Sequence, residues 1–344
     1  MKKRFLIPSI IPLLFPNIAF AAPCADGVNA DGCTISSTQL DYTLTGDIET
    51  APGVKGIEFQ SGAIGNATTL TGNITTSGDS AYGLYLLSSD SNTTSLIGNI
   101  TTSGASAHGF YLYNSDSNTT SLTGDISTEG DGAHGVFFDN GISNTMTMSG
   151  NITSTGNNIY GFYISAQTSS SITMSGDITL SDGYGMMILD SDSNTLTMTG
   201  DITSTSGDYS MGAYFINSDS NTLTVANISA EGTINGDGIY LVDSDLNEIS
   251  INGKVSASGY ALYANSTSDN NTLILNQGSV ISGEIRNDGT NNTLKLNLGA
   301  GRSYALETSG SSSWTIQDLN NRPMVTGSAY GIGVGNIETQ GHEM

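Results

Sequence analysis

Cationic residues are scarce in this chain, with Lys and Arg numbering 9 against 32 Asp and Glu, a formal net charge of −23. Such an acidic surface repels phosphate backbones and anionic headgroups, so nucleic acid is not expected as a partner. Only 3 histidines and 2 cysteines are present, which leaves few candidates for a nucleophile–base pair or a thiolate metal site. Charged residues make up 12% of the chain, so Ser, Thr, Asn and Gly dominate its surface.

Long hydrophobic runs are absent except at the beginning. Lys2 to Arg4 form a basic segment, Phe5 to Phe15 is apolar, and Ala19-Phe20-Ala21 offers small residues to a signal peptidase. This pattern predicts a secretory signal peptide over residues 1–21, and its apolar run is too short to span a bilayer. Its removal takes three cations with it and leaves a mature charge of 6 − 32 = −26.

Cysteine use fits export. Cys24 and Cys33 follow the predicted cleavage site and are the only cysteines in the chain. In an exported protein, a pair that closes such a short loop is most simply a disulfide. We therefore expect residues 22–39 to form an N-terminal cap held by a Cys24–Cys33 bridge.

The rest of the chain repeats itself. A Gly-(Asn/Asp)-Ile motif recurs at intervals of 26 residues, five times, and then of 24. Apolar residues alternate with polar ones before each motif, and a period of two is typical of a β-strand, not a helix. The motif begins at Gly46, Gly72, Gly98, Gly124, Gly150, Gly176 and Gly200.

A polar residue lies eight positions before most of these isoleucines, and it is nearly always asparagine. One such amide per repeat predicts an internal ladder, in which each side chain bonds to the same side chain in the repeats above and below. A structural role also accounts for most of the Asn-x-Thr sequons. The predicted ladder consists of Asn66, Asn92, Asn118, Asn144, Asn194, Asn221, Asn247, Asn271 and Asn292, with Ser170 in one place.

A second strand follows each motif and reads, for example, "YGLYL" at Tyr82 and "HGFYL" at His108. Its glycine permits a corner, and alternation places the middle aromatic residue opposite the inward pair. This predicts an outward-facing aromatic stripe that binds a ligand or stacks to stabilise the fold. The stripe consists of Tyr85, Tyr111, Phe137, Tyr163, Tyr214 and Tyr240, with Met187 interrupting it. The facing of the flanking series, Tyr82, His108, His134 and Tyr160, stays undecided because the corner follows it directly.

A repeat of this length cannot bury its apolar face alone, but identical coils stacked ~4.8 Å apart can. The sequence therefore predicts an all-β protein, a right-handed parallel β-helix with coils of about 26 residues. Residues 40–298 form the coils, and residues 299–344 form a degenerate end. A leucine-rich repeat would need a denser leucine pattern than these coils contain.

Motifs for catalysis and metals are incomplete. His108 and His134 share a repeat position with tyrosines, which favours flat packing groups over metal ligands. The basic residues are too scattered for a polysaccharide-cleaving site. Stacked turn carboxylates can recruit Ca²⁺ between coils, and solvated turns explain them equally well. These acids are Asp90, Asp116, Asp192, Asp219 and Asp245. No enzyme activity, cofactor or metal is predicted.

The signal peptide, the acidic cysteine-poor composition and the tandem Gly-(Asn/Asp)-Ile coils resemble the passenger domains of autotransporters, the type V secretion proteins of Gram-negative bacteria. The resemblance covers roughly residues 40–335. It implies a β-helix displayed at the cell surface or released, which serves adhesion, aggregation or the presentation of a virulence activity. Such proteins also carry a C-terminal translocator barrel, and the residues after Trp314 are too few to form one.

Three functional classes follow. The first is a non-enzymatic adhesin that binds a glycan, a host or bacterial surface protein, or another copy of itself. The second is a passive stalk that presents another activity. The third, a polysaccharide-active enzyme, is disfavoured by the missing cluster of acids and bases.

Overall fold

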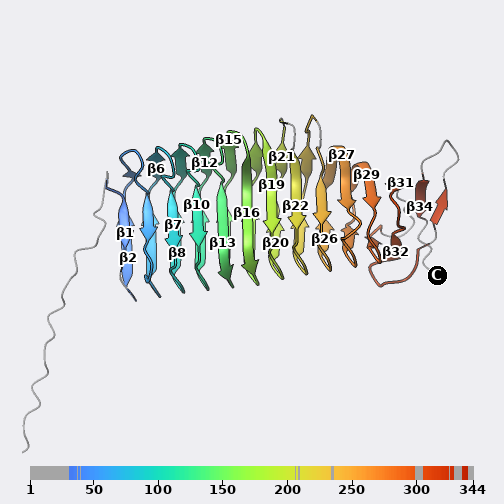
Figure 1. Ribbon diagram of the computed structural model, residues 1–344, viewed down its shortest axis with the longest axis horizontal. Helices are drawn as coiled ribbons and strands as arrows, with labels where there is room; N and C mark the ends of the chain where they lie inside the picture. Colours follow the sequence, from blue (N-terminus) through green and yellow to red (C-terminus); the bar gives the residue numbers. More distant parts are fainter. Residues whose placement is uncertain are drawn as a thin grey trace, which may run out of the picture.

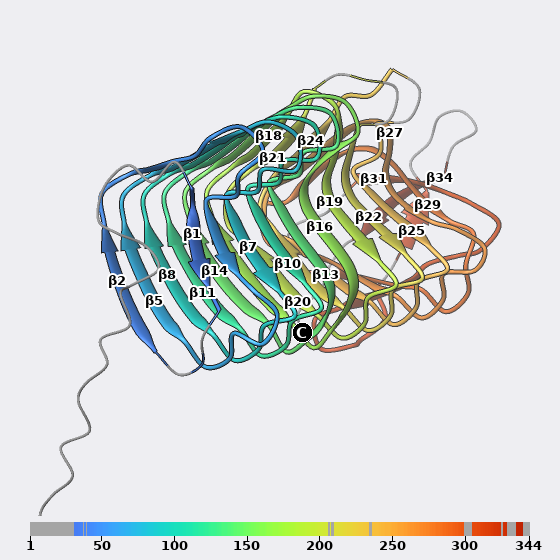
Figure 2. The same ribbon diagram turned by 60° about the vertical axis from the view of Figure 1, so that its left-hand side comes forward.

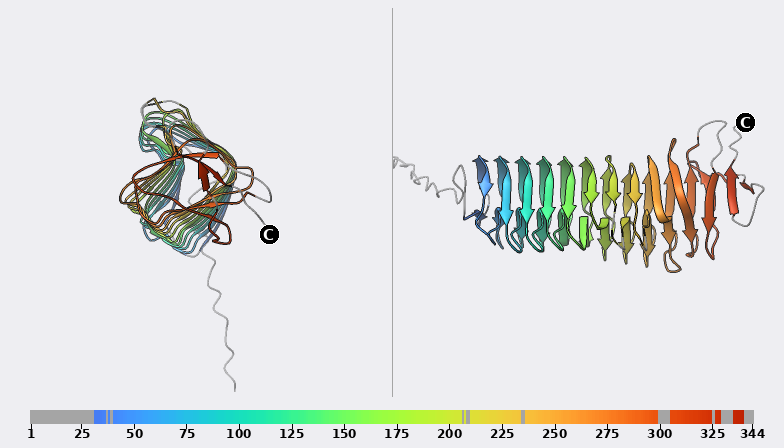
Figure 3. Two further views of the ribbon diagram at one scale, coloured as in Figure 1. Left: turned by 90° about the vertical axis from the view of Figure 1, so that its right-hand side faces the viewer. Right: turned by 90° about the horizontal axis from the view of Figure 1, so that it is seen from above.

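Parallel β-strands, stacked coil upon coil, make up most of the described part of the chain. The computed structural model describes residues 31–36, 38, 40–205, 207, 210–233, 236–298, 305–324, 326–328 and 335–339. The predicted signal peptide, Cys24 and His342 lie outside these residues. The coils follow one another along the long axis of the molecule (Figure 1) and superimpose when viewed along it (Figure 3). Together these features make an all-β parallel β-solenoid; its handedness stays a prediction.

One face of the solenoid is a sheet of 12 strands that are neighbours in register. Equivalent residues lie 26 apart through the first six strands, as in Leu70–Leu96–Leu122. The strands are β2 (Asp41–Thr45), β5 (Ala67–Thr71), β8 (Thr93–Ile97), β11 (Thr119–Thr123), β14 (Thr145–Ser149), β17 (Ser171–Ser175), β20 (Thr195–Met198), β23 (Thr222–Val225), β26 (Glu248–Ile251), β28 (Thr272–Leu275), β30 (Thr293–Leu296) and β32 (Thr315–Asp318).

A sheet of 22 strands forms the rest of each coil, in two stacks. The first stack follows the Gly-(Asn/Asp)-Ile motif: β3 (Ile48–Glu49), β6 (Ile74–Ser77), β9 (Ile100–Ser103), β12 (Ile126–Glu129), β15 (Ile152–Thr155), β18 (Ile178–Leu180), β21 (Ile202–Ser204) and β24 (Ile228–Ala230). The second stack contains β1 (Cys33–Ile35), β4 (Ile57–Phe59), β7 (Leu84–Leu87), β10 (Phe110–Tyr113), β13 (Val136–Ile142), β16 (Ile159–Thr168), β19 (Gly183–Leu189), β22 (Met211–Ile216) and β25 (Ile239–Val242).

Towards the C-terminal end the two stacks merge. β27 (Lys254–Ala264) pairs with both β24 and β25, so one strand runs through the corner. β29 (Val280–Asn287) pairs with β27, and β31 (Ala305–Ser309) pairs with β29, all in parallel. β33 (Thr326–Ser328) and β34 (Gly335–Thr339) then pair antiparallel. Parallel pairing therefore extends on both sides of the predicted 40–298 range, to β1 and to β32.

The core is a set of apolar columns that run the length of the stack. Leu70, Leu96, Leu122 and Met148 form one column, and each is 1–3% exposed. The motif isoleucines from Ile74 to Ile228 form another. Every coil contributes the same inward positions, so each buries its apolar face against the coils above and below. Burial of a Leu or Ile side chain stabilises the fold by ~1.5–3 kcal/mol, and this repeated contribution holds the coils together.

Each asparagine of the predicted ladder is buried. The Asn92 side-chain amide donates to Asn118 Oδ1 at 3.2 Å, and the Asn118 amide donates to Asn144 Oδ1 at 3.3 Å. The same amides also donate to a backbone carbonyl of the preceding coil, such as that of Ser89 for Asn118. At Ser170 the hydroxyl takes over and accepts the backbone N–H of Asn144. Further amide–amide bonds link Asn66 to Asn92, Asn194 to Asn221, Asn221 to Asn247 and Asn247 to Asn271.

The recurring Ser-Asp-x-Asn sequence of these turns has a role at every position. In the turn from Ser115 to Asn118, Ser115 is buried and accepts the backbone N–H of Ser89. Asp116 accepts the backbone N–H of Ile142, and Ser117 adopts a positive φ of 57°. The resulting serine ladder was not predicted from the sequence, although a serine three residues before six of the nine ladder asparagines signals it. It contains Ser89, Ser115, Ser191, Ser218, Ser244 and Ser268.

Glycine is required where the motif turns the chain. Gly98 has φ of 150° and Gly124 has φ of 144°, in a region that L side chains rarely adopt. A Cβ at Gly124 would lie 2.2 Å from the carbonyl oxygen of Gly98. Any larger residue would push adjacent coils apart, which explains why the glycine recurs with the period of the coil.

Candidate functional site

The predicted aromatic stripe lies on the outward side of the second stack, one residue per coil from β7 to β25. Tyr111, Phe137 and Tyr163 pair in register through β10, β13 and β16. The stripe is less open than the alternation suggests: most members are half-buried, and Tyr85 is only 7% exposed. Neighbouring coils and a second aromatic row cover them.

The flanking series forms this second row, so its side chains lie on the same outward side as the stripe. Tyr82 lies 5.0 Å from both Tyr85 and Tyr111, between ring centroids, and His108 lies 5.2 Å from Tyr111. At the glycine between the rows the alternation breaks, because Gly83 and Leu84 are both buried, so Tyr82 and Tyr85 share one side although they are three residues apart. Sequence alternation alone would have placed them on opposite sides.

Within each row the rings stack face to face along the solenoid. In the aromatic stripe, the ring centroids of Tyr111 and Phe137 lie 4.8 Å apart with an interplanar angle of 11°. Those of Phe137 and Tyr163 lie 4.4 Å apart with an angle of 8°. Between rows the contacts are edge-on, as in His134–Phe137 at 85°. Because both faces of an internal ring are covered, the surface presents ring edges and tyrosine hydroxyls. Each stacked pair contributes ~0.5–1.5 kcal/mol beyond burial.

The two histidines of the second row serve the backbone of the next coil. His108 Nδ1 accepts the N–H of His134 at 3.0 Å, and His134 Nδ1 accepts the N–H of Tyr160 at 3.2 Å. Burial lowers the pKa of His108 to about 4, and burial together with the charge of His108 lowers the pKa of His134. Asp237 occupies the same row and accepts the N–H of Tyr260. The two histidines are therefore neutral at pH 7, and all three side chains act as hydrogen-bond acceptors within the stack.

Each end of the aromatic rows is covered by a cation. At the N-terminal end, the Lys55 ammonium lies 4.5 Å from the Tyr85 centroid and pairs with Glu58. Glu58 continues the register of the stripe, because β4 pairs with β7. Cation–π contacts of this kind contribute ~0.5–1 kcal/mol at exposed sites. In the sequence Lys55 is one of several scattered cations, so this contact was not predicted.

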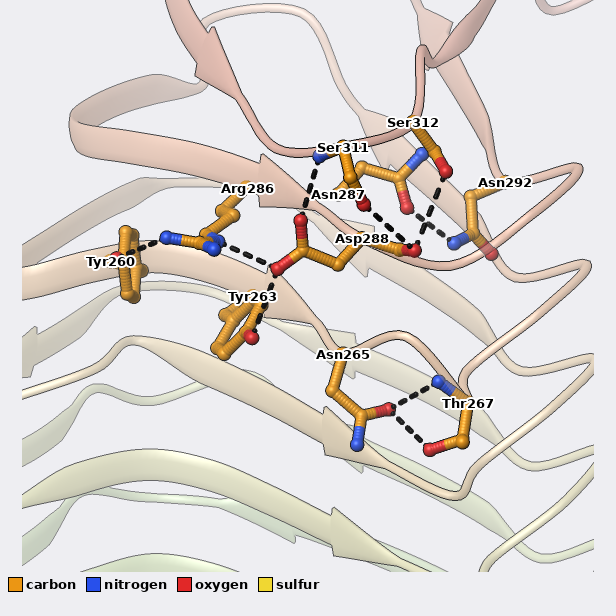
Figure 4. Close-up of polar contacts among 10 residues, drawn as sticks. All are labelled: Tyr260, Tyr263, Asn265, Thr267, Arg286, Asn287, Asp288, Asn292, Ser311 and Ser312. Carbon is orange, nitrogen blue, oxygen red and sulfur yellow. Dashed lines mark hydrogen bonds and ion pairs between the residues drawn. The ribbon is translucent and has the colours of Figure 1, made fainter.

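Figure 4 shows the C-terminal end, where Tyr260 and Tyr263 extend the rows. The Arg286 guanidinium lies 5.5 Å and 5.2 Å from their ring centroids, and its Nε donates to Asp288 Oδ2 at 2.8 Å. Burial opposes ionisation of Asp288, but bonds from the Ser311 backbone and Arg286 outweigh it and hold the Asp288 pKa at about 2. These residues were not predicted from the sequence either, because the shorter last coils break the 26-residue spacing.

A third outward row lies beside the stripe, two residues further along each strand. It contains apolar side chains at most positions, and all are half-buried. Asp139 and Ser165 are the exceptions; burial raises the pKa of Asp139, although hydrogen bonds with Tyr111 and Ser165 lower it in part. The row consists of Leu87, Tyr113, Asp139, Ser165, Leu189, Ile216 and Val242. We call the three rows together the aromatic surface.

The turn aspartates that were candidate calcium ligands link adjacent coils by accepting backbone N–H groups. Each of three aspartates accepts the backbone N–H of the equivalent aspartate in the next coil. Asp90 accepts that of Asp116 at 2.9 Å, Asp192 that of Asp219 at 2.8 Å, and Asp219 that of Asp245 at 2.7 Å. Within the described ranges, no group of three or more His, Cys, Asp or Glu lies close enough to hold a metal ion. Nor do these ranges contain a helix long and apolar enough to cross a membrane.

Cys33 is buried and disulfide-bonded. Its predicted partner, Cys24, lies outside the described residues. β1, which begins at Cys33, pairs in parallel with β4, so the bond attaches at the first described strand of the stack.

The fold and this surface define the class of the protein as a parallel β-solenoid with stacked polar and aromatic columns. No protein-family model, curated protein or solved structure matches the chain.

Proposed function

We propose that this protein is a non-enzymatic, exported β-solenoid that adheres to a protein surface through its aromatic surface. The observation that carries the proposal is the arrangement of the three outward rows. They place tyrosine hydroxyls and apolar side chains side by side over seven consecutive coils, from β7 to β25. Tyrosine-rich surfaces that combine an apolar body with a polar tip are favoured at protein interfaces.

The stacking geometry favours a protein over a glycan as the partner. A sugar ring binds an aromatic side chain by lying on its face. Here the faces of Tyr111, Phe137 and Tyr163 are covered by one another at 4.4–4.8 Å. The outermost faces are covered as well, by Lys55 at one end and Arg286 at the other. The edges and hydroxyls that remain suit hydrogen bonds and side-chain packing with a protein.

The absence of enzyme activity is part of the proposal, and it is supported by what the reactive side chains do. His108 and His134 use Nδ1 to accept backbone N–H groups, and the turn aspartates do the same. A general base needs a lone pair that is free for a substrate, and the imidazole lone pairs of His108 and His134 are occupied.

Placement at the cell surface, or release from it, rests on the predicted signal peptide and on the resemblance to autotransporter passengers. Partners would then be proteins of a host cell or of another bacterium, or a second copy of this chain.

Charge placed on the third row tests the proposal without disturbing the stacked rings. We expect the triple variant Leu87→Glu, Leu189→Glu and Val242→Glu to lose adhesion to cells at least about tenfold, because three carboxylates would be desolvated at the interface. The matched control carries Thr75→Glu, Thr179→Glu and Thr203→Glu on the first stack. Adhesion is measured with the exported chain by flow cytometry, and circular dichroism checks the fold.

Three outcomes decide between the functional classes. Loss of adhesion in the first variant alone supports a binding role for the aromatic surface. Equal adhesion of both variants and the parent places the contact elsewhere. No adhesion and no self-association of the parent chain, with the latter followed by sedimentation, favours the passive stalk.

A further inference from the structure

The 12-stranded sheet has an outward face of a different kind. From β5 to β23, its outward positions form columns that pair in register from coil to coil. All but two of the residues in these columns are threonine or serine, and all are exposed or half-buried. The first column is Ala67, Thr93, Thr119, Thr145, Ser171, Thr195 and Thr222; the second is Thr69, Ser95, Ser121, Thr147, Thr173, Thr197 and Thr224; the third is Thr71, Ile97, Thr123, Ser149 and Ser175. We call these columns the hydroxyl array.

No charged residue lies in the array, although the chain carries 32 acids. On the same face, charged residues lie only outside the array, at Asp41 in β2, Glu248 in β26 and Lys295 in β30. A neutral face of this kind suits a partner that is itself uncharged and that binds through hydrogen bonds and methyl groups.

The array is regular in two directions. Neighbouring strands lie about 4.8 Å apart, and alternate residues along a strand lie about 6.7 Å apart. Threonine is β-branched and stiff at χ1, so its hydroxyl and methyl groups repeat with the backbone. The buried Asn92–Asn118–Asn144 bonds hold the coils at constant separation beneath the array. Figure 2 shows β2, β5, β8, β11 and β14 side by side along this face.

These two repeats lie close to the repeats of water oxygens on the prism face of hexagonal ice. From this match we infer that the hydroxyl array binds the surface of ice crystals. Threonine hydroxyls replace lattice waters at the repeat of the array, and the methyl groups between them exclude disordered water. A lysine or glutamate within the array would hold its own hydration shell and break the match, so a charge-free face is required. Over the described coils, no other outward face offers three neutral columns.

Crystalline polysaccharide is the competing occupant, because it also presents hydroxyl groups at regular intervals. Binding of sugar rings to a flat face generally uses exposed aromatic rings. The hydroxyl array contains none, and the aromatic residues lie on the second stack. The structure therefore favours ice, and polysaccharide becomes an outcome of the test.

The test measures inhibition of ice recrystallisation and thermal hysteresis by the exported chain. Thr147 lies in the second column with Ser121 and Thr173 as its register partners. We expect Thr147→Lys to need about tenfold more protein for the same inhibition, and Thr173→Lys to behave alike. The matched control is Thr153→Lys, an equally exposed threonine in β15 on the first stack. Circular dichroism and thermal unfolding check the fold of each variant.

Full activity in the parent and in the Thr153 variant, with loss in both array variants, would support ice binding by the array. An inactive parent chain overturns the proposal. So does equal activity of the array variants and the control. Retention of the parent by microcrystalline cellulose or chitin, lost on Thr147→Lys and without any effect on ice, would assign the array to polysaccharide instead.

Discussion

Replacement of Asn118 by leucine removes the most connected side chain of the asparagine ladder. Asn118 is 1% exposed, and its Oδ1 accepts the backbone N–H of Asn92 at 2.9 Å. Its Nδ2 donates to the Ser89 carbonyl at 2.9 Å. Leucine leaves that N–H and that carbonyl buried without partners, and each such group costs about 1–3 kcal/mol. We therefore expect Asn118→Leu to lower the free energy of unfolding by about 2–5 kcal/mol, after the added apolar burial offsets part of the loss.

Two further variants separate the ladder from a general effect of substitution. Thr119 is exposed on the 12-stranded sheet, so Thr119→Leu should cost less than about 0.5 kcal/mol. Asn118→Ser should fall between the two, because Ser170 shows that a hydroxyl can accept the N–H of the preceding coil. Urea unfolding followed by circular dichroism gives the free energies. Equal destabilisation by the two leucine variants would refute the ladder as a source of stability.

Two other predictions follow from the stacked histidines and from the disulfide. Because the pKa of His108 is about 4 in the folded chain and about 6.5 when unfolded, the unfolded state binds the proton first as the pH falls. The contribution of neutral His108 to the free energy of unfolding is thus fully present above about pH 6.5 and is lower by roughly 2–3 kcal/mol at pH 4.5. The double variant His108→Tyr and His134→Tyr should lose less stability between these two pH values, as measured by urea unfolding at each. An unchanged pH profile of the variant would contradict this prediction. Reduction of the exported chain should add two hydrogens to its intact mass and lower its stability by about 2–3 kcal/mol through the Cys24–Cys33 bridge, whereas two free thiols before reduction would exclude that bridge.

The fold could be predicted from the sequence because each coil repeats the same local requirements. The glycine at Gly98 and Gly124 marks a turn that no larger residue can occupy, and strict alternation separates Leu96 from Ser95 and Ile97. Since equivalent residues of successive coils are register partners, a pattern with a period of 26 residues also specifies which residues stack. A buried amide once per period then implies a ladder, because the same amide in the next coil lies within hydrogen-bond distance of it.

The candidate surface could not be predicted in full from the 26-residue repeat. Whether Tyr82 and Tyr85 share a side depends on the corner at Gly83, and a corner is a backbone angle that alternation does not encode. The coverage of ring faces depends on ring orientation, and the end contacts of Lys55 and Arg286 join segments whose spacing departs from 26 residues. The sequence by itself thus determined the coil, its register and its inward columns, because these follow from local periodicity. Only the tertiary structure decided what the outer surface presents to a partner, because that depends on how side chains of different strands meet in space.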